Sequence, residues 1–477
     1  MKYLSFSHEI TIYWLYDESL DNASYDIYLN DEYIETINKS SYTFENLKSD
    51  SFYLVEVKIN GTTIFKEEIK TRPEKNIIKV DLPTDGKKLL TKELQQIIDK
   101  AQEDDLIYFP KGTYLTGALF LHDSQEIYLE EDATILGSDN YKDYLPKIHS
   151  RFEGIENESY ASLINIGVLN RNNKTSISHI YIHGKGTIFG GGKSLIDSII
   201  NEEEKYLQND ANSFINAGRK RNRLINISNA DDVVISGLHL GQSSSWNIHP
   251  IYSKNIFIYN CHIESYGLHN GDGIDPDSSH DVFIFNNVFD VGDDCVALKS
   301  GKNPEGNIIN IPCYNIYIFD CYSIAGHGCS IGSEISGGIH DVFIFNCDFK
   351  NTYHGLQLKT TPKRGAYIRN IHVKNSSFAA ICIHTVDYND DGETSGELTR
   401  IENVNINNVS LFGVAHHKSK PSTKIDYIKI CGFKEDISAF NNIHIKNVQI
   451  HEKDDDKNIK IINDVTNIIV ENVVIKD

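Results

Sequence analysis

Short stretches in which apolar and polar residues alternate run through most of the chain and predict strands rather than helices. From residue 105 onward they share one pattern: an Asn or Asp, an apolar or β-branched run, and a second Asn or Asp. The copies begin at Asn255, Asp281, Asn315, Asp341, Asn370, Asn403, Asn442 and Asn467, with earlier ones at His179 and Asp232. They recur about every 25 to 40 residues, a spacing typical of solenoids and propellers.

Many of these units are too short for a propeller blade, whose four strands need about 40 to 45 residues. One coil of a right-handed parallel β-helix fits them better, because the inward Ile, Val and Phe residues of stacked coils form a continuous core. The Asn at each bend can then form a ladder with its equivalents above and below. We therefore predict an all-β chain with a right-handed parallel β-helix over residues 76–477, and regard a β-sandwich with chance similarity as the less favoured alternative.

The first 75 residues have a different pattern, in which short strands between residues 8 and 71 alternate aromatic and β-branched residues with polar ones. This pattern is typical of a two-layer sandwich, and around Trp14 and Leu47 it resembles a fibronectin type III domain. We therefore predict a small sandwich over residues 1–75. Residues 91–105 have helical spacing with Thr91 as a candidate N-cap, and a single helix followed only by strands suits a lid.

The charge balance restricts the partners, because 46 Lys and Arg residues stand against 67 Asp and Glu residues, a net charge of −21. Such a chain is not expected to bind nucleic acid or an anionic membrane.

Residues 1–20 lack the apolar core and cleavage site of a signal peptide, so we expect a cytoplasmic protein, or a secreted one if a signal has been removed. The eight Cys residues all follow residue 260 and are expected to be buried free thiols.

Polar residues at matching places in four successive repeats indicate a site, since equivalent residues of stacked coils lie about 4.8 Å apart. Asp272, the pair Asp293 and Asp294, His327 and Lys359 all fall on one side by this count. Like charges this close disfavour joint ionisation, so one carboxyl group can stay protonated while the others remain anionic. Hydrolysis of a glycosidic bond needs such an acid together with a base that activates water.

Four motifs then resemble the ordered signatures of the polygalacturonases, glycoside hydrolase family 28. They are NGDGIDPDSS (270–279), GDDC (292–295), GHGCSIGSE (326–334) and GLQLKTTPKRGAYIRNI (355–371). With further similarity at 109–121 and 243–250, the resemblance covers residues 80–475. It implies a parallel β-helix that hydrolyses α-1,4-galacturonan with inversion, acts on a pectic oligosaccharide or polysaccharide, and needs no cofactor and no metal.

By position in the motifs, the resemblance implies that Asp293 is the general acid and that Asp272 and Asp294 orient and deprotonate the water. His327 would contact the carboxylate cluster and keep its protonation correct. The candidate substrate-binding residues are Lys359, Gln357, Asn270, His249, Lys299 and Arg364. Exo action is expected, because a fibronectin-type domain ahead of the β-helix resembles exo-acting bacterial members in which added segments close the cleft. The insertions at 189–222 and 303–314 are the candidate closing wall.

Two positions depart from the family pattern. Gly271 replaces a Thr, and Gln357 stands where an Arg is usual, which removes a bidentate clamp for a carboxylate. Either Lys363 or Arg364 holds the uronate after the cleaved bond, or the sugar there is neutral, as in rhamnogalacturonan. A calcium-dependent pectate lyase and a non-catalytic polysaccharide-binding β-helix remain as further alternatives.

Overall fold

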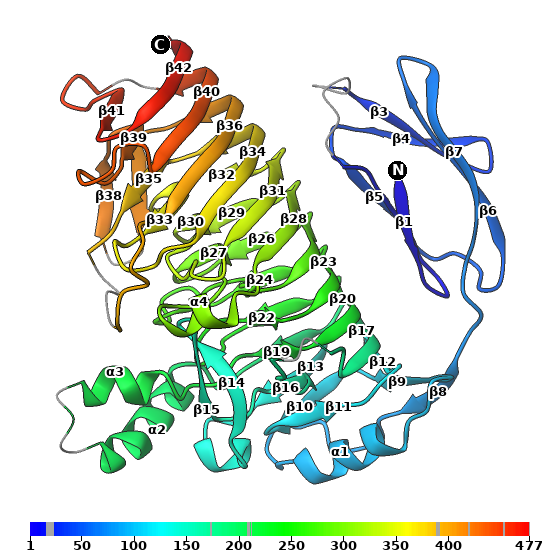
Figure 1. The fold of residues 1–477 in the computed structure, drawn as a ribbon. Helices are drawn as coiled ribbons and strands as arrows, with labels where there is room; N and C mark the ends of the chain where they lie inside the picture. The colour runs from blue at the N-terminus through cyan, green and yellow to red at the C-terminus, as the bar shows by residue number, and fades with distance from the viewer. Residues whose placement is uncertain are drawn as a thin grey trace.

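The computed structural model describes residues 1–15, 23–171, 174–207, 210, 212–387, 392–417, 420–451 and 454–476. A long parallel β-helix carries a small β-sandwich on one flank (Figure 1). The first wall of the β-helix is a sheet of 21 strands. These strands are β8 (Asn76–Lys79), β9 (Asp105–Phe109), β10 (Gly112–Thr116), β12 (Glu126–Leu129), β13 (Ala133–Gly137), β17 (Ile177–Gly184), β18 (Thr187–Phe189), β20 (Ala230–Ser236), β21 (His239–Gly241), β23 (Lys254–Tyr259), β24 (His262–Glu264), β25 (His280–Phe285), β26 (Val288–Asp290), β28 (Cys313–Phe319), β29 (Tyr322–Ala325), β31 (Ile339–Phe345), β32 (Asp348–Phe349), β34 (Tyr367–Phe378), β36 (Arg400–Leu411), β40 (Phe440–His451) and β42 (Thr466–Lys476).

A second wall consists of a four-stranded and a six-stranded parallel sheet, which Ile274 connects through bridges to Ile248 and Val296. The four-stranded sheet contains β11 (Leu119–Leu121), β16 (Ile164–Gly167), β19 (Ile225–Ser228) and β22 (Ile248–Ile251). The six-stranded sheet contains β27 (Asp294–Leu298), β30 (Gly328–Ile331), β33 (Gly355–Thr360), β35 (Ala380–Thr385), β39 (Ile428–Cys431) and β41 (Lys460–Asn463). The predicted parallel β-helix is confirmed, and this second wall carries the candidate site.

The predicted polar ladder at the bends is also confirmed. All eight residues at which the later repeats begin, from Asn255 to Asn467, adopt left-handed backbone conformations with φ between 52° and 58°. Asn and Asp tolerate this region better than other residues with a side chain. The side chains also bond from coil to coil: Asn403 donates to Asn370 (3.2 Å), and Asn442 donates to Asn403 (2.7 Å). The Asn and Asp positions therefore turn the corners of the coils.

Inside the coils, equivalent apolar residues stack into one core. Ile256, Val282, Ile316, Val342 and Ile371 are paired in register from β23 to β34, and each is fully buried. Burial of an Ile or Val side chain contributes about 1.5 to 3 kcal/mol, so each further coil adds to the stability of its neighbours. The eight Cys residues are free, as predicted, and six of them are buried, whereas Cys382 and Cys431 are half-buried.

One helix, α1 (Thr91–Lys100), packs against β10 and β11 at the N-terminal end of the β-helix, with Leu94 and Ile98 buried (Figure 1). The helix was expected, but Thr91 is not its N-cap. Leu90 occupies that position, and the Thr91 hydroxyl accepts a hydrogen bond from the backbone N–H of Gly117 (2.7 Å) instead. Within the described part of the chain, no helix has the length and apolar character that crossing a membrane requires.

The N-terminal sandwich has two antiparallel sheets around Trp14, Val55 and Val57. One sheet contains β1 (Lys2–Ser5), β2 (Ile10–Tyr13) and β5 (Ser41–Phe44), and the other contains β3 (Tyr25–Leu29), β4 (Glu32–Ile37), β6 (Phe52–Ile59) and β7 (Thr62–Lys70). The three-stranded sheet faces the outside of the first wall, where the Tyr13 ring stacks on Phe285 at 5.5 Å. The sandwich therefore covers an aromatic stripe of the β-helix.

Insertions between the coils gather on the other flank (Figure 1). They are the hairpin β14 (Ile148–Phe152) and β15 (Ile155–Ser159), the helices α2 (Gly192–Glu203), α3 (Ser213–Gly218) and α4 (Glu305–Ile309), the 3₁₀ turns η2 (Tyr141–Tyr144) and η3 (Glu204–Tyr206), and the hairpin β37 (Val414–His417) and β38 (Lys420–Lys424). The two segments predicted as a closing wall are among them. The hairpin β14–β15 was not predicted.

Candidate active site

Neighbouring coils bring the predicted acid–base residues together on the second wall. Asp294 begins β27 and Asp293 directly precedes it, His327 directly precedes β30, and Lys359 lies near the end of β33. Asp272 comes from the preceding coil, close enough for its charge to interact with both Asp293 and Asp294. The column that the repeat spacing predicted is therefore present in the structure.

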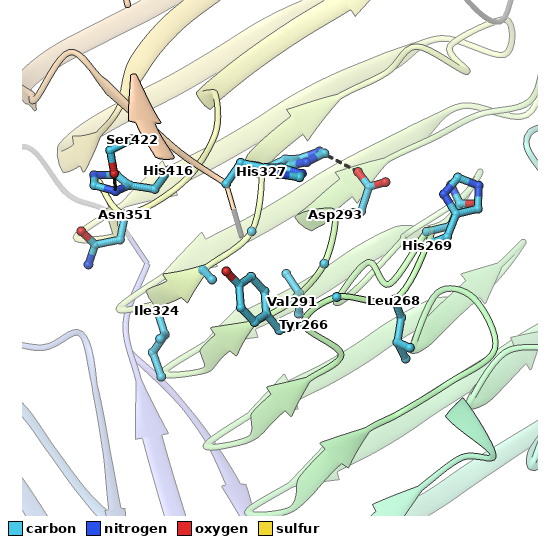
Figure 2. A pocket seen from close by; sticks show the side chains of 16 residues that line it. Tyr266, Leu268, His269, Val291, Asp293, Ile324, His327, Asn351, His416 and Ser422 are labelled. Atoms are coloured by element: carbon cyan, nitrogen blue, oxygen red, sulfur yellow. Dashed lines mark hydrogen bonds and ion pairs between the residues drawn. The ribbon is translucent and has the colours of Figure 1, made fainter. Parts of the chain in front are cut away.

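Asp293 and His327 form an ion pair with 2.8 Å between Oδ1 and Nδ1 (Figure 2). Burial by itself raises the pKa of Asp293, but the hydrogen bond and charge of His327 outweigh it and leave this pKa below its usual range. Burial lowers the pKa of His327, and the same bond and charge raise it above its ordinary value. With these shifts the proton of the pair lies on His327 rather than on Asp293, the residue that the resemblance implies as general acid.

The proton that repulsion retains belongs to a deeper pair, Asp272 and Asp275. Burial, followed by the charges of Asp275 and Asp293, raises the pKa of Asp272 well above its usual range. Burial also raises the pKa of Asp275, to about 7, against the opposing effect of Lys299. Desolvation and like charge favour the neutral acid, so this pair keeps a proton near neutral pH.

Asp294 is held by two donors. The hydroxyl of Ser330 donates to its Oδ1 at 2.7 Å, and the Lys359 ammonium lies 3.2 Å from its Oδ2. Hydrogen bonds of this kind fix the position and orientation of the carboxyl group. The cluster thus combines a protonated carboxyl group, a fixed carboxylate and a carboxylate paired with an imidazolium.

A pocket of about 620 Å³ opens directly onto the Asp293–His327 pair (Figure 2). Asp272 and Asp294 are not among its lining residues, and each is only 3% exposed, whereas the Asp293 side chain keeps 26% exposure. Its lining residues come from the loop after β24, from the segments before β27 and β30, from Asn351 and from the β37–β38 hairpin, and none comes from the sandwich. Asp293 is therefore the carboxylate of the cluster that a ligand in this pocket meets first.

Aromatic side chains surround His327 and restrict its ring. The rings of Tyr353, His354 and His417 lie 5.3, 5.6 and 5.6 Å from it. Burial lowers the pKa of His354 to about 3, so this neighbour stays neutral while His327 carries the charge. The His327 ring is thus held in the orientation that its bond to Asp293 requires.

Among the predicted substrate-binding residues, Asn270 lines the pocket and its Oδ1 accepts a hydrogen bond from Arg221 Nη2 at 2.6 Å. Gln357 is 2% exposed, and its amide nitrogen Nε2 lies 2.8 Å from Nε2 of His384. Because an amide nitrogen can only donate, the His384 nitrogen accepts. Burial lowers the pKa of His384 to about 4, which agrees with a neutral ring. No charge stands where the family usually has a guanidinium.

Three other predicted residues lie behind the pocket surface. His249 is fully buried between Arg223 and Asp277, and burial lowers its pKa to about 3. Lys299 lies 3.4 Å from Asp275, and Arg364 is fully buried with its Nε donating to the Ser333 carbonyl at 3.0 Å. None of these three residues lines the pocket, and His249 and Lys299 support the carboxylates from behind.

Sequence reasoning missed two buried site residues, Asp275 and Arg151. Asp275 stands in the first motif, but only its burial beside Asp272 reveals the shared proton. Arg151 comes from the β14–β15 hairpin, and its Nη1 lies 2.8 Å from Asp277 Oδ1 with both side chains fully buried. The repeat pattern could not place this hairpin, because the hairpin interrupts the coils and has no counterpart in them.

Asp293, Asp294 and His327 also offer three ligand atoms within 4.8 Å of one another, a geometry that could hold a metal ion. However, Asp293 Oδ1 already binds the His327 imidazolium, and the Lys359 ammonium lies beside Asp294. These two cations supply the positive charge that a metal would bring. The described residues therefore fit an acid–base cluster better than a metal centre.

Comparison with known proteins places this geometry in a family. The model of glycosyl hydrolases family 28 matches residues 136–466. A Vitis vinifera protein named "Probable polygalacturonase" is 32% identical over 304 residues, covering 61% of this chain and 57% of the relative. An exo-poly-alpha-D-galacturonosidase of Dickeya chrysanthemi is 26% identical over 351 residues, covering 67% of this chain and 58% of the relative.

Among solved structures, a family 28 exopolygalacturonase of Yersinia enterocolitica has the same fold, with a TM-score of 0.84 at 22% identity. That likeness covers 99% of this chain and 95% of the other. The match to this chain spans less than two thirds of the length of the two curated relatives. The family match includes all five residues of the acid–base column and most of the β-helix, and the chain belongs to glycosyl hydrolases family 28.

Proposed function

We propose that this protein is an inverting glycoside hydrolase that cleaves α-1,4-galacturonosidic bonds of pectic oligogalacturonate or polygalacturonate. The observation that carries the proposal is the cluster of Asp272, Asp293 and Asp294 with His327 and Lys359, with one carboxylate exposed to a pocket. Family membership and the names of the two curated relatives support the same substrate class.

In this mechanism Asp293 protonates the oxygen of the cleaved bond, because it is the carboxyl group that faces the pocket. Water attacks the sugar carbon and gives its proton to Asp294, while the neutral Asp272 donates a hydrogen bond to that water. The Asp293–His327 pair holds one proton between its two partners. A bound acidic sugar excludes water and adds negative charge, which favours the neutral pair and therefore the acid form of Asp293.

The proposal predicts that Asp293→Asn lowers kcat at least 100-fold while substrate binding persists, since an amide cannot supply the proton. Asp290→Asn, in β26 and outside the residues lining the pocket, is the matched control. Proton NMR of the first product identifies its anomer. A product with retained configuration would contradict inversion, and an Asp293→Asn protein with normal turnover would contradict the role of Asp293.

We further propose exo action that releases galacturonate from non-reducing ends. The insertions on the flank of the β-helix support a cleft closed at one end: Arg221 follows α3 and bonds to Asn270, and Glu305 of α4 accepts the backbone N–H of Glu156 in β15. A product profile of monomer alone is expected. A ladder of oligomers at early times would instead indicate endo action.

A second candidate is hydrolysis of the bond between galacturonate and rhamnose in rhamnogalacturonan, which the uncharged Gln357–His384 pair favours. A neutral sugar after the cleaved bond would not need a guanidinium there. Release of galacturonate from oligogalacturonides and from rhamnogalacturonan oligomers separates the two. Activity that depends on added calcium and gives an ultraviolet-absorbing product would instead indicate a lyase, and binding without turnover would indicate a non-catalytic protein.

For the chain as a whole, we propose a fibronectin type III-like domain at residues 1–75 and a catalytic domain at 76–477. The three- and four-stranded sheets of the sandwich support the first assignment, and β8, which begins at Asn76 and pairs with β9, supports the boundary. Expression of residues 76–477 alone tests whether the second unit folds and retains hydrolysis.

A further inference from the structure

A second groove of about 410 Å³ adjoins the catalytic pocket. Both are lined by Asn351 and His416, so the two form one continuous surface. The groove lies toward the C-terminal coils, and its lining residues are Lys350, Asn351, Phe412, Val414, His416, His451 and Lys476. None of the acid–base residues is among them, so the groove cannot take part in the chemistry directly.

The register of the coils explains the shape of this groove. Phe349, Phe378 and Leu411 are paired at the ends of β32, β34 and β36, so Lys350, Ala379 and Phe412 follow at equivalent places. The small Ala379 separates the two larger side chains, and the Lys350 ammonium lies 5.6 Å from the Phe412 ring centre.

On the opposite side the Phe412 ring stacks on His451, 4.5 Å away with 1° between the planes. His451 is in turn paired in register with Lys476, at the end of β42. The other side of the Phe412 ring faces the position of Ala379, where the Lys350 ammonium lies over the ring and no other aromatic ring of the described residues covers it. An apolar ring face in a groove of this kind can pack against the C–H groups of a sugar.

The charge of the groove is opposite to that of the chain. The protein has a net charge of −21, yet the charged side chains lining the groove are Lys350 and Lys476, beside His416 and His451. One acidic group faces them: Asp348 Oδ2 lies 2.7 Å from the Lys350 ammonium. Lys476 is exposed at the edge of the groove. The combination of cations and an aromatic platform suits an acidic sugar.

We propose that this groove is a distal subsite, which binds a uronate unit of the same chain whose cleaved bond lies at Asp293. Lys350 and Lys476 attract the carboxylate of that unit, and Phe412 packs against its ring. This inference rests on the proposed function for the identity of the chain. It assigns to the C-terminal coils a preference for longer oligomers over dimers.

The test compares tetragalacturonate with digalacturonate, which is too short to occupy both sites. In Phe412→Ala and Lys476→Glu proteins, the ratio of kcat/KM for the tetramer to that for the dimer should fall about tenfold, mainly through KM. Lys446→Glu is the matched control, because Lys446 is in the same coil as His451 but lies in a different groove. An unchanged ratio in both groove variants would overturn the subsite.

A binding measurement separates this inference from the proposed function. Titration calorimetry of tetragalacturonate into Asp293→Asn protein, with and without Lys476→Glu, measures the subsite without turnover. Weaker binding of about five- to tenfold supports the groove even if the wild-type protein hydrolyses no galacturonide, and equal affinity contradicts it even if hydrolysis is found. Because Lys476 is exposed, its substitution is compatible with folding.

Discussion

At Asp293, burial and an imidazolium compete to set the protonation state of one carboxyl group. Burial favours the acid, but the 2.8 Å bond to His327 favours the anion and prevails. In the buried pair behind it, Lys299 lies 3.4 Å from Asp275, but burial prevails and the pair of Asp272 and Asp275 keeps its proton. Adjacent carboxyl groups therefore differ in charge because their nearest neighbours differ.

The first prediction concerns the pH dependence of kcat/KM, which reports the free enzyme. The alkaline limb should follow the loss of the proton from the Asp293–His327 pair, above the ordinary pKa of a His because the His327 pKa is raised. In His327→Gln protein that proton rests on a carboxyl group alone, so the limb should move to lower pH and kcat should fall about 100-fold or more. His354→Gln, whose pKa of about 3 keeps this ring neutral, should leave the limb in place. A limb that stays fixed in His327→Gln would contradict this assignment.

The second prediction concerns Asp272 and stability. Its folded pKa is raised, so between about pH 4 and that raised value only the folded chain holds the proton, and the free energy of unfolding falls as pH rises. Asn does not titrate, so Asp272→Asn removes the fall in the free energy of unfolding that Asp272 causes as pH rises. The substitution should therefore stabilise the fold by about 1 to 4 kcal/mol at pH 7, and by less at pH 5. Urea unfolding at both pH values measures it, with the exposed Asp197→Asn as control. An equal effect at the two pH values would rule out the raised pKa as its cause.

At the scale of elements, the Asn and Asp residues at the corners between strands determine where each coil turns. Asn403 has φ of 58°, donates to Asn370 and accepts from Asn442, so one residue satisfies both the backbone and the ladder. Few other residues with a side chain enter this conformation at low cost. The positions of the repeated Asn and Asp residues in the sequence therefore predict where the backbone turns.

The third prediction separates the contribution of the ladder hydrogen bonds from that of the left-handed backbone conformation at such a corner. Asn403→Gly still allows the left-handed conformation but removes two ladder bonds, and should lower the free energy of unfolding by about 1 to 2 kcal/mol. Asn403→Ala adds left-handed strain and should cost about 1 to 2 kcal/mol more. The exposed Asn405 on the same strand provides the control Asn405→Ala. Urea midpoints at an unchanged m-value give the differences, and equal midpoints for Gly and Ala would exclude backbone strain.

At the scale of the molecule, the sandwich is attached to the β-helix by polar bonds as well as stacked rings. Asp320, at a corner of the β-helix, accepts the backbone N–H of Ser40 at 2.6 Å and the Ser41 hydroxyl at 3.3 Å. Tyr13 stacks on Phe285 beside them. These contacts keep the sandwich on the flank away from the insertions, so its effect on catalysis can only be indirect.

The fourth prediction tests this attachment. Asp320→Gly removes the acceptor but tolerates the left-handed corner, where φ is 54°. Hydrogen exchange at Ser40 and along β5 should become about tenfold faster, because the Ser40 N–H loses its partner. Asn375→Gly makes the same kind of change at another corner, where the Asn375 side chain accepts a hydrogen bond from Asn408 of the β-helix. Unchanged exchange in the Asp320→Gly protein would show that ring stacking alone holds the interface.

The sequence by itself determined the period of the coils, their corners and the order of Asp272, Asp293, Asp294, His327 and Lys359, because strand alternation and left-handed turns are local properties of a few residues. Only the tertiary structure decided that His327, not Asp293, carries the proton, that Arg364 is buried away from the pocket, and that Arg151 reaches Asp277 from a hairpin. These outcomes depend on burial and on contacts between distant segments. A pKa is set by what surrounds the group, and neither its dielectric environment nor its partners across the fold can be read from a one-dimensional pattern.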